Sequence, residues 1–214
     1  MDLTPQELRV LGSLVEKQRT TPDQYPLSLN ALRLACNQST NRDPVVEYDE
    51  SDIREALERL ARRRWVRLAS GAGSRATKYR HLLDEALGLS VPEIAVLAVL
   101  MRRGAQTPGE LRARTERLHR FGGQDELAET IEDLVGRQLV VRLARRPGQK
   151  EERYSHLLGE EVEAESAPQP ARVSALPLVE RVERLEAEMA ELRAAVETLQ
   201  GAVQTEPHTV KPPA

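Results

Sequence analysis

A repeated segment is the feature of this sequence that most constrains its fold. Residues 67–83, RLASGAGSRATKYRHLL, return 75 residues later as residues 142–158, RLARRPGQKEERYSHLL. Both copies contain Arg-Leu-Ala, a variable stretch of nine residues, and then Tyr-x-His-Leu-Leu. A pattern that recurs at this distance predicts two copies of one folding unit rather than a single large domain.

Three amphipathic helices are expected in each repeat. Thr4, Pro5 and Glu7 form a helix start signal, since a capping hydroxyl precedes a first-turn proline and a carboxylate that can reach back. Apolar residues then recur three and four positions apart, and the segment LSVPEIAVLAVLM opens the second repeat in the same way. By the same pattern, second helices are predicted at 28–35 and 107–118, and third helices at 52–63 and 126–137.

The apolar period changes after each third helix. Residues 65–68 and 139–143 are typical of short strands, and each is followed by a Gly-containing turn and a return through Tyr79 or Tyr154. Three helices followed by a β-hairpin are the winged-helix form of the helix-turn-helix. We therefore expect a mostly α protein with small β-hairpins, an α+β class, with tandem winged-helix domains at 1–86 and 87–159.

Two further segments resemble a known family. The stretches ACNQSTNRDPVVEYDE, residues 35–50, and TPGELRARTERLHRF, residues 107–121, are similar to those of the YceH-like family of uncharacterised bacterial proteins. The resemblance covers roughly residues 3–159 and implies tandem winged-helix domains. It implies no activity and no catalytic or binding residues.

The C-terminal part of the chain has a different composition. Residues 160–175 are rich in Pro, Ala and Glu and predict a disordered acidic linker, and residues 204–214 predict a disordered tail. Between them, residues 176–203 carry apolar residues at alternating spacings of four and three, which predicts a coiled coil and a homodimer. The alternative is a helix that packs on its own chain or frays. The expected dimerisation residues are Leu178, Val182, Leu185, Met189, Leu192, Val196 and Leu199.

Nothing in the sequence indicates an enzyme. Cys36, the only cysteine, follows an apolar helix face and is expected to be a buried small residue. His81 and His156 occupy equivalent repeat positions, which suggests a shared structural hydrogen bond rather than metal ligation. We expect no catalytic residues, metal or cofactor. No leader peptide is visible and the longest apolar run has eight residues, so we expect a soluble, cytoplasmic protein with no membrane contact.

A basic stretch in the first repeat indicates double-stranded DNA as a possible partner. Residues 54–80 contain nine basic and two acidic residues, although the whole chain has a net charge of −3. Winged helices commonly place the third helix in the major groove and the wing on phosphates. The alternative is a solvated helix with pairs such as Glu55 with Arg59 and Glu58 with Arg62. The candidate nucleic-acid-binding residues are Arg54, Arg59, Arg62, Arg63, Arg67, Arg75, Lys78 and Arg80.

The charge pattern of the second repeat predicts a different kind of binding partner. The third helix of this repeat turns Glu126, Glu129, Glu132 and Asp133 outward, and phosphates would repel these carboxylates. We therefore expect a protein partner on the second domain. The rival hypothesis for the whole chain is a protein-interaction scaffold in which both winged helices are docking surfaces and no nucleic acid is bound.

Overall fold

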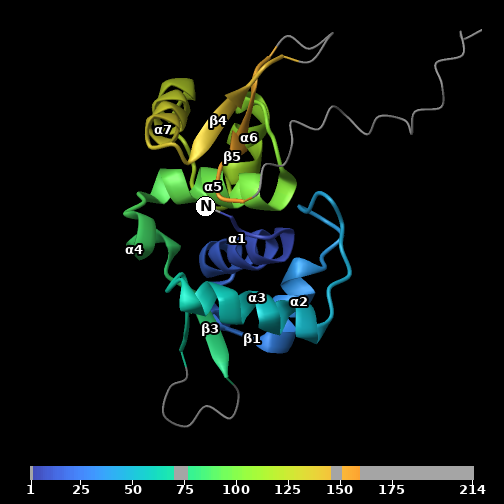
Figure 1. The fold of residues 1–214 in the computed structure, drawn as a ribbon. Coiled ribbons are helices and arrows are strands. Elements are labelled where there is room, and N and C mark those ends of the chain that lie inside the picture. The colour runs from blue at the N-terminus through green and yellow to red at the C-terminus, as the bar shows by residue number, and fades with distance from the viewer. Residues whose placement is uncertain (1, 70–76, 146–150, 160–214) are drawn as a thin grey trace, which may run out of the picture. The chain divides into compact units, whose positions relative to one another are not determined.

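The computed structural model describes residues 2–69, 77–145 and 151–159 of the 214 (Figure 1). The first repeat contains α1 (Pro5–Thr20), the short 3₁₀ helix η1 (Pro22–Gln24), β1 (Leu27–Ser28), α2 (Leu29–Cys36), α3 (Glu50–Arg62), β2 (Val66–Leu68) and β3 (Lys78–His81). The short helix α4 (Leu83–Leu87) connects the two repeats. The second repeat contains α5 (Val91–Arg103), α6 (Pro108–Thr115), α7 (Gln124–Gly136), β4 (Val140–Leu143) and β5 (Arg153–His156). The α+β class is confirmed.

The helix starts follow from local sequence. At α1 the Thr4 hydroxyl accepts a hydrogen bond from the backbone of Glu7, and the Glu7 carboxylate accepts one from the backbone N–H of Thr4 at 2.7 Å. The same reciprocal cap opens α5 at Ser90 and α6 at Thr107. Each cap uses two amide groups that a helix end otherwise leaves without a partner, which fixes where the helix begins.

The two repeats also end their third helices in the same way. Arg64 and Gln138, 74 positions apart, both take the left-handed conformation, with φ of 61° and 56°. The following N–H, of Trp65 or Leu139, then donates to a carbonyl of the last helical turn at 3.0 or 2.9 Å. This shared turn directs both chains from the third helix into the first strand of the hairpin.

Both predicted hairpins are present, but the first repeat has an additional strand. β2 and β3 pair antiparallel, and the short strand β1 pairs with the other edge of β3 to give the order β1-β3-β2. In the second repeat β4 pairs with β5, and a single bridge between Gln106 and Tyr154 stands where β1 pairs with Tyr79 in the first repeat. The sequence does not predict β1, because two residues are too few for a periodic signal.

The first helices of the two repeats pack against each other and form the centre of one core. In Figure 1, α2 and α3 cover the outer side of α1, whereas α6 and α7 cover the outer side of α5. Every residue from Glu7 to Glu16 and from Glu93 to Arg102 is buried. A Cβ on Gly12 of α1 would lie 2.8 Å from Cγ of Arg102, so the absence of a side chain at Gly12 allows this close packing.

The beginning of the chain also contacts the end of the second repeat. The N–H of Leu3 donates to the carbonyl of Leu158 at 3.1 Å, and Leu3 forms a parallel bridge with Gly159. Among the described residues, no helix combines the length and apolar character needed to cross a membrane. The predicted linker at 160–175, coiled coil at 176–203 and tail at 204–214 lie outside the described residues.

Candidate nucleic-acid interface

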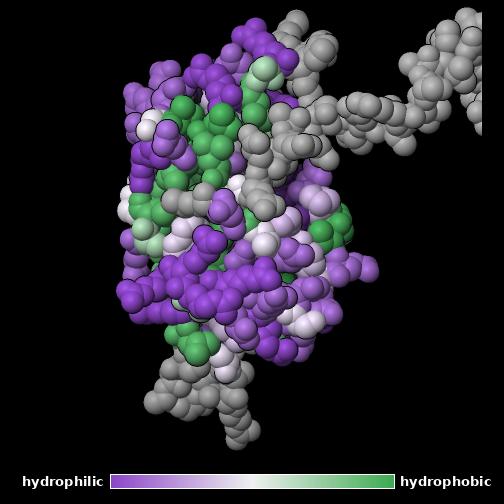
Figure 2. Space-filling model, viewed as in Figure 1, coloured by the Kyte–Doolittle hydropathy of each residue, from purple (hydrophilic) through white to green (hydrophobic). Residues whose placement is uncertain are grey.

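Helix α3 lies on the outside of the first repeat and carries most of the candidate residues. Ile53, Leu57 and Leu60 are buried on the side of α3 that faces the core. Arg54 and Arg62 are on the exposed side. Figure 2 shows a hydrophilic band across this face of the molecule, over α3. The position is therefore accessible to a large partner such as a duplex.

Three of the candidate cations form ion pairs with carboxylates four or five residues away in sequence. Arg54 lies 3.8 Å from Glu50, and Arg59 is paired with Glu55, one turn earlier on the same helix. Arg80 of β3 lies 2.9 Å from a carboxylate oxygen of Glu85 in α4. These pairs are exposed, so each contributes little to stability and can exchange its partner for a phosphate. The pairing of Glu55 with Arg59 is one that the sequence predicted.

Other candidate cations have no such partner. Arg62 and Arg67 are exposed and Lys78 is half-buried, and their side chains form no ion pair or hydrogen bond within the part of the chain that the structure describes. The predicted pair of Glu58 with Arg62 does not form, although both residues are described. Arg63 donates to the carbonyl of Asp2 at 3.3 Å. Arg75 lies outside the described residues.

The strand register places several of these cations on one face of the sheet. Arg67 of β2 is directly opposite Arg80 of β3, and Lys78 lies two positions along the same strand. Side chains alternate between the two faces of a strand, so all three share a face. Like charges directly opposite one another are unfavourable, which favours binding of an anion there. Arg64, in the turn before β2, is also exposed and was not among the predicted site residues.

The third helix of the second repeat has the opposite character. Glu126, Glu129, Glu132 and Asp133 of α7 are all exposed, in agreement with the sequence analysis. Figure 2 shows hydrophobic side chains between α7 and β4, where a groove of about 530 Å³ lies beside α6. Its apolar wall and charged rim include Leu127, Ala128, Ile131, Tyr154, Glu132, Arg145, Glu151 and Glu152. This surface suits a protein segment better than a phosphate backbone.

Comparison with known sequences assigns the family. The family model described as "Protein of unknown function, DUF480" matches residues 3–149. The chain belongs to the DUF480 family. A "UPF0502 protein" of Serratia proteamaculans is 45% identical over 205 residues, covering 92% of this chain and 95% of the relative. The "UPF0502 protein YceH" of Salmonella newport is 46% identical over 206 residues, covering 92% and 96%. The resemblance to the YceH-like family is thus confirmed.

Cys36, His81 and His156 of the DUF480 chain are buried. Burial raises the pKa of Cys36 to about 11, so its thiol remains protonated at neutral pH. Nε2 of His81 lies 2.7 Å from Oε1 of Gln18, whereas Nδ1 of His156 has no hydrogen-bond partner among the described residues. Nδ1 of His81 accepts a hydrogen bond from the N–H of Leu83 at 3.3 Å, a contact that Nδ1 of His156 lacks, so the expectation of a shared hydrogen bond is wrong. Within the described ranges, no group of three or more His, Cys, Asp or Glu could hold a metal.

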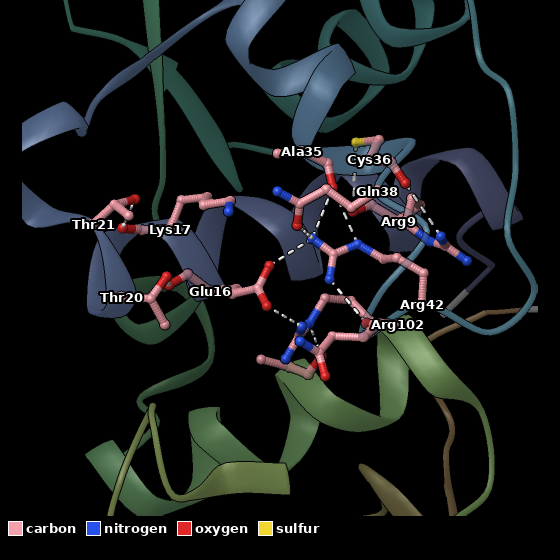
Figure 3. Close-up of polar contacts among 12 residues, drawn as sticks. Arg9, Glu16, Lys17, Thr20, Thr21, Ala35, Cys36, Gln38, Arg42 and Arg102 are labelled. Carbon is pink, nitrogen blue, oxygen red and sulfur yellow. Dashed lines mark hydrogen bonds and ion pairs between the residues drawn. The ribbon is translucent and has the colours of Figure 1, made fainter.

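A buried ionic network between the two repeats of this DUF480 protein was not predicted from the sequence (Figure 3). Glu16 of α1 lies between Arg42, from the loop after α2, and Arg102 of α5, at 2.5 Å from each. Burial alone would raise the pKa of Glu16, but the hydrogen bond from Arg42 and the charge of Arg102 lower it. Burial lowers the pKa of Arg102 to about 10, which leaves it charged at neutral pH. The network therefore links α1, the loop after α2 and α5 through buried charged side chains.

A weak signal for this network exists in the sequence. Glu16 and Arg102 each follow an apolar run at a helical position that faces inward, and Arg42 lies in the polar segment NRDP. Charges at inward positions are unusual unless they are paired. Their pairing could not be read from the sequence, because Glu16 is 26 residues from Arg42 and 86 from Arg102.

Proposed function

We propose that this protein is a non-enzymatic DNA-binding protein of two tandem winged-helix domains, residues 1–86 and 87–159. Each repeat has three helices followed by an antiparallel hairpin, which supports the winged-helix assignment. The observation that carries the DNA proposal is the set of cations without described partners at the end of α3 and on the hairpin. They are Arg62, Arg64, Arg67 and Lys78.

The distribution of charge along α3 favours contact with phosphates over contact with bases. The first half of α3 and its cap carry the carboxylates of Asp49, Glu50 and Asp52, which the phosphates lining a groove would repel. The cations gather at the other end, where α3 leads into β2. Phosphate contacts position a protein on a duplex without reading its sequence. We therefore propose binding with little sequence preference, in the cytoplasm, where bacterial DNA lies.

The C-terminal segment adds a proposal of self-association. The heptad pattern of residues 176–203 supports a homodimer, and residues 160–175 form a linker between this segment and the second domain. A dimer would present two cationic surfaces to one duplex and raise the apparent affinity by effective concentration. Sedimentation of a chain that ends at Glu165 should give a monomer, where the full chain gives a dimer. An equal mass for both would refute this part.

The alternative function is a scaffold that binds a protein partner in the second repeat. The groove beside α7 has an apolar wall of Leu127, Ile131 and Tyr154, and the exposed face of α7 is acidic. An occupant of matching chemistry would be a basic peptide with apolar anchors. In this alternative, the cations of α3 are a solvated surface and the chain binds no nucleic acid.

The salt dependence of binding tests the DNA proposal. Fluorescence anisotropy with a mixed-sequence duplex, from about 50 to 200 mM salt, measures the slope of log K against log salt concentration, which is about −0.9 for each phosphate contact. The double variant Arg62→Ala/Arg67→Ala should make this slope shallower by about 1.8, which corresponds to about 60-fold weaker binding at 0.1 M salt. No binding by the parent protein at low salt would favour the scaffold.

A matched control separates the site from net charge. Arg112 and Arg120 are exposed on the second repeat, in α6 and the turn after it, away from α3. Arg112→Ala/Arg120→Ala removes the same charge and should leave the slope unchanged. An equal effect of both double variants would show that only overall charge matters, and the proposed surface would be wrong.

A further inference from the structure

A cationic cavity lies at the junction of the two repeats, on the side where α1 and α5 end. It has a volume of about 290 Å³ and is formed by the last turn of α1, the loop after α2, the end of α5, and α6 with the turn after it. This volume suits a small ligand. Five cations are among its lining residues, and they are Lys17, Arg102, Arg103, Arg114 and Arg117.

The negative charges nearby do not balance these cations. Glu16, the carboxylate in the lining, is already shared by Arg102 and the buried Arg42. Glu110 lies 3.1 Å from Arg114, and the charge of Asp43 acts on Arg103. With Arg42 included, six cations therefore face three carboxylates, which leaves an excess of three positive charges around the cavity.

The basic and amide side chains of the lining offer hydrogen-bond donors to the cavity. Arg103 donates to Oδ1 of Asn41 at 2.7 Å, and Arg42 donates to Oε1 of Gln38 at 3.3 Å. Each amide oxygen is thereby engaged by an arginine, and each NH₂ group remains available for donation. The ammonium of Lys17 and the guanidinium of Arg117 have no hydrogen-bond partner in the described parts of the chain. Figure 3 shows Lys17 on the turn of α1 next to Glu16, with Gln38 close to Arg42.

The electrostatics of the cavity also favour an added anion. Burial lowers the pKa of Lys17, Glu16 partly offsets this, and the surrounding arginines lower the pKa again. Burial likewise lowers the pKa of Arg103, and the charge of Arg114 lowers it further. Cations that repel one another in a partly buried site gain stabilisation when an acceptor-only anion binds between them.

We propose that this cavity binds a small phosphorylated molecule through a pyrophosphate-like group. A cluster of guanidinium groups, an ammonium and amide donors recognises several phosphate oxygens at once, and Arg provides paired donors that match phosphate geometry. The cavity is too small to admit a nucleic-acid duplex, which favours a free small molecule as its occupant. The proposal does not depend on the proposed DNA-binding function, because the residues of the two sites are different.

Calorimetric titration of the full-length protein with inorganic pyrophosphate tests the proposal, with sodium chloride of equal ionic strength as the reference. We expect saturable binding to the parent protein. Lys17→Gln/Arg117→Gln removes two charged contacts and should weaken binding at least about tenfold for each contact. Lys17→Arg should retain binding. Because Arg117 is exposed and Lys17 half-buried, the double variant should keep the thermal midpoint of the free protein. Arg114→Gln, at a half-buried position of α6, is a second variant that should also weaken binding.

Two controls define the outcomes. Arg112→Gln/Arg120→Gln removes the same net charge outside the cavity and should bind as the parent does. Arg62→Ala/Arg67→Ala should also bind pyrophosphate normally, so a failure of the DNA proposal is distinguishable from a failure of this one. The proposal would be overturned if pyrophosphate gave heats no larger than those of chloride. It would also be overturned if the Arg112/Arg120 control lost as much pyrophosphate affinity as the Lys17/Arg117 variant. Loss of duplex binding in the Lys17/Arg117 variant, without pyrophosphate binding by the parent, would assign the cations to nucleic acid and overturn it as well.

Discussion

Replacement of Glu16 by Gln should strongly destabilise the protein. The substitution preserves shape but removes the negative charge between two arginines whose side chains are 0% and 3% exposed. Two charge-assisted hydrogen bonds are weakened, each contributing roughly 1.5 to 3 kcal/mol. Breaking a buried ion pair by removing one partner costs about 3 to 5 kcal/mol. We therefore expect a loss of about 4 kcal/mol from a free energy of unfolding that is typically about 5 to 15 kcal/mol.

Urea unfolding at pH 7, followed by circular dichroism, measures this loss. The control is Glu116→Gln, because Glu116 pairs with Arg120 at 3.8 Å on an exposed surface. That variant should change the free energy of unfolding by less than about 0.5 kcal/mol. A loss below about 1 kcal/mol for Glu16→Gln, at an unchanged denaturant slope, would refute the reasoning. It would show that water or a structural rearrangement compensates for the loss of the negative charge next to Arg42 and Arg102.

The pH dependence of the parent protein gives a related check. The folded pKa of Glu16 lies below its unfolded value of about 4.5, so the unfolded state binds a proton first as the pH falls. The contribution of Glu16 to stability is therefore fully present above about pH 4.5 and is lost as the pH falls through the lowered folded pKa. Glu16→Gln should lack this part of the acid dependence.

Other expected outcomes concern the buried histidines and two helical glycines. Burial lowers the pKa of His81 and of His156 from 6.5 to about 4. For each of these histidines, the free energy of unfolding of the protein should fall by about 3 kcal/mol as the pH falls from 6.5 to 4. His156→Leu should reduce the difference between urea unfolding free energies at pH 7 and pH 5, and an unchanged difference would contradict the burial argument. Gly12→Ala should destabilise by about 1 to 3 kcal/mol, because its Cβ would force α1 away from α5. Gly136→Ala, whose Cβ meets nothing within 4 Å, should be neutral or stabilising by up to about 1 kcal/mol, and a similar loss in both variants would argue against the close packing at Gly12.

The repeated architecture could be predicted because its signals are local. The cap at Thr4 and Glu7 involves residues three apart, and the hairpins appear as a change of period next to Tyr79 and Tyr154. The pairing of Glu55 with Arg59, expected under the alternative of a solvated helix, could be predicted for the same reason, since the two lie one helical turn apart. Each of these features depends on neighbours in sequence, so a single sequence is sufficient to find it.

Features that depend on distant residues were missed. β1 exists only because β3 offers it a free edge, and α4 is a short helix between the repeats. The candidate site was partly predictable, since its residues are contiguous in sequence. The sequence could not predict which of these cations lack a partner, because the pairing of Arg80 with Glu85 depends on the turn into α4. The cationic cavity needs four separate elements to come together, and no local pattern marks it.

The mutual burial of α1 and α5 constrains how such a chain can evolve. Along these helices, each repeat forms part of the other's interior. Deleting residues 90–159 would leave the side of α1 that now contacts α5 open to water. A shortened gene should therefore yield an aggregating or rapidly degraded product, so the loss of one repeat should be strongly selected against.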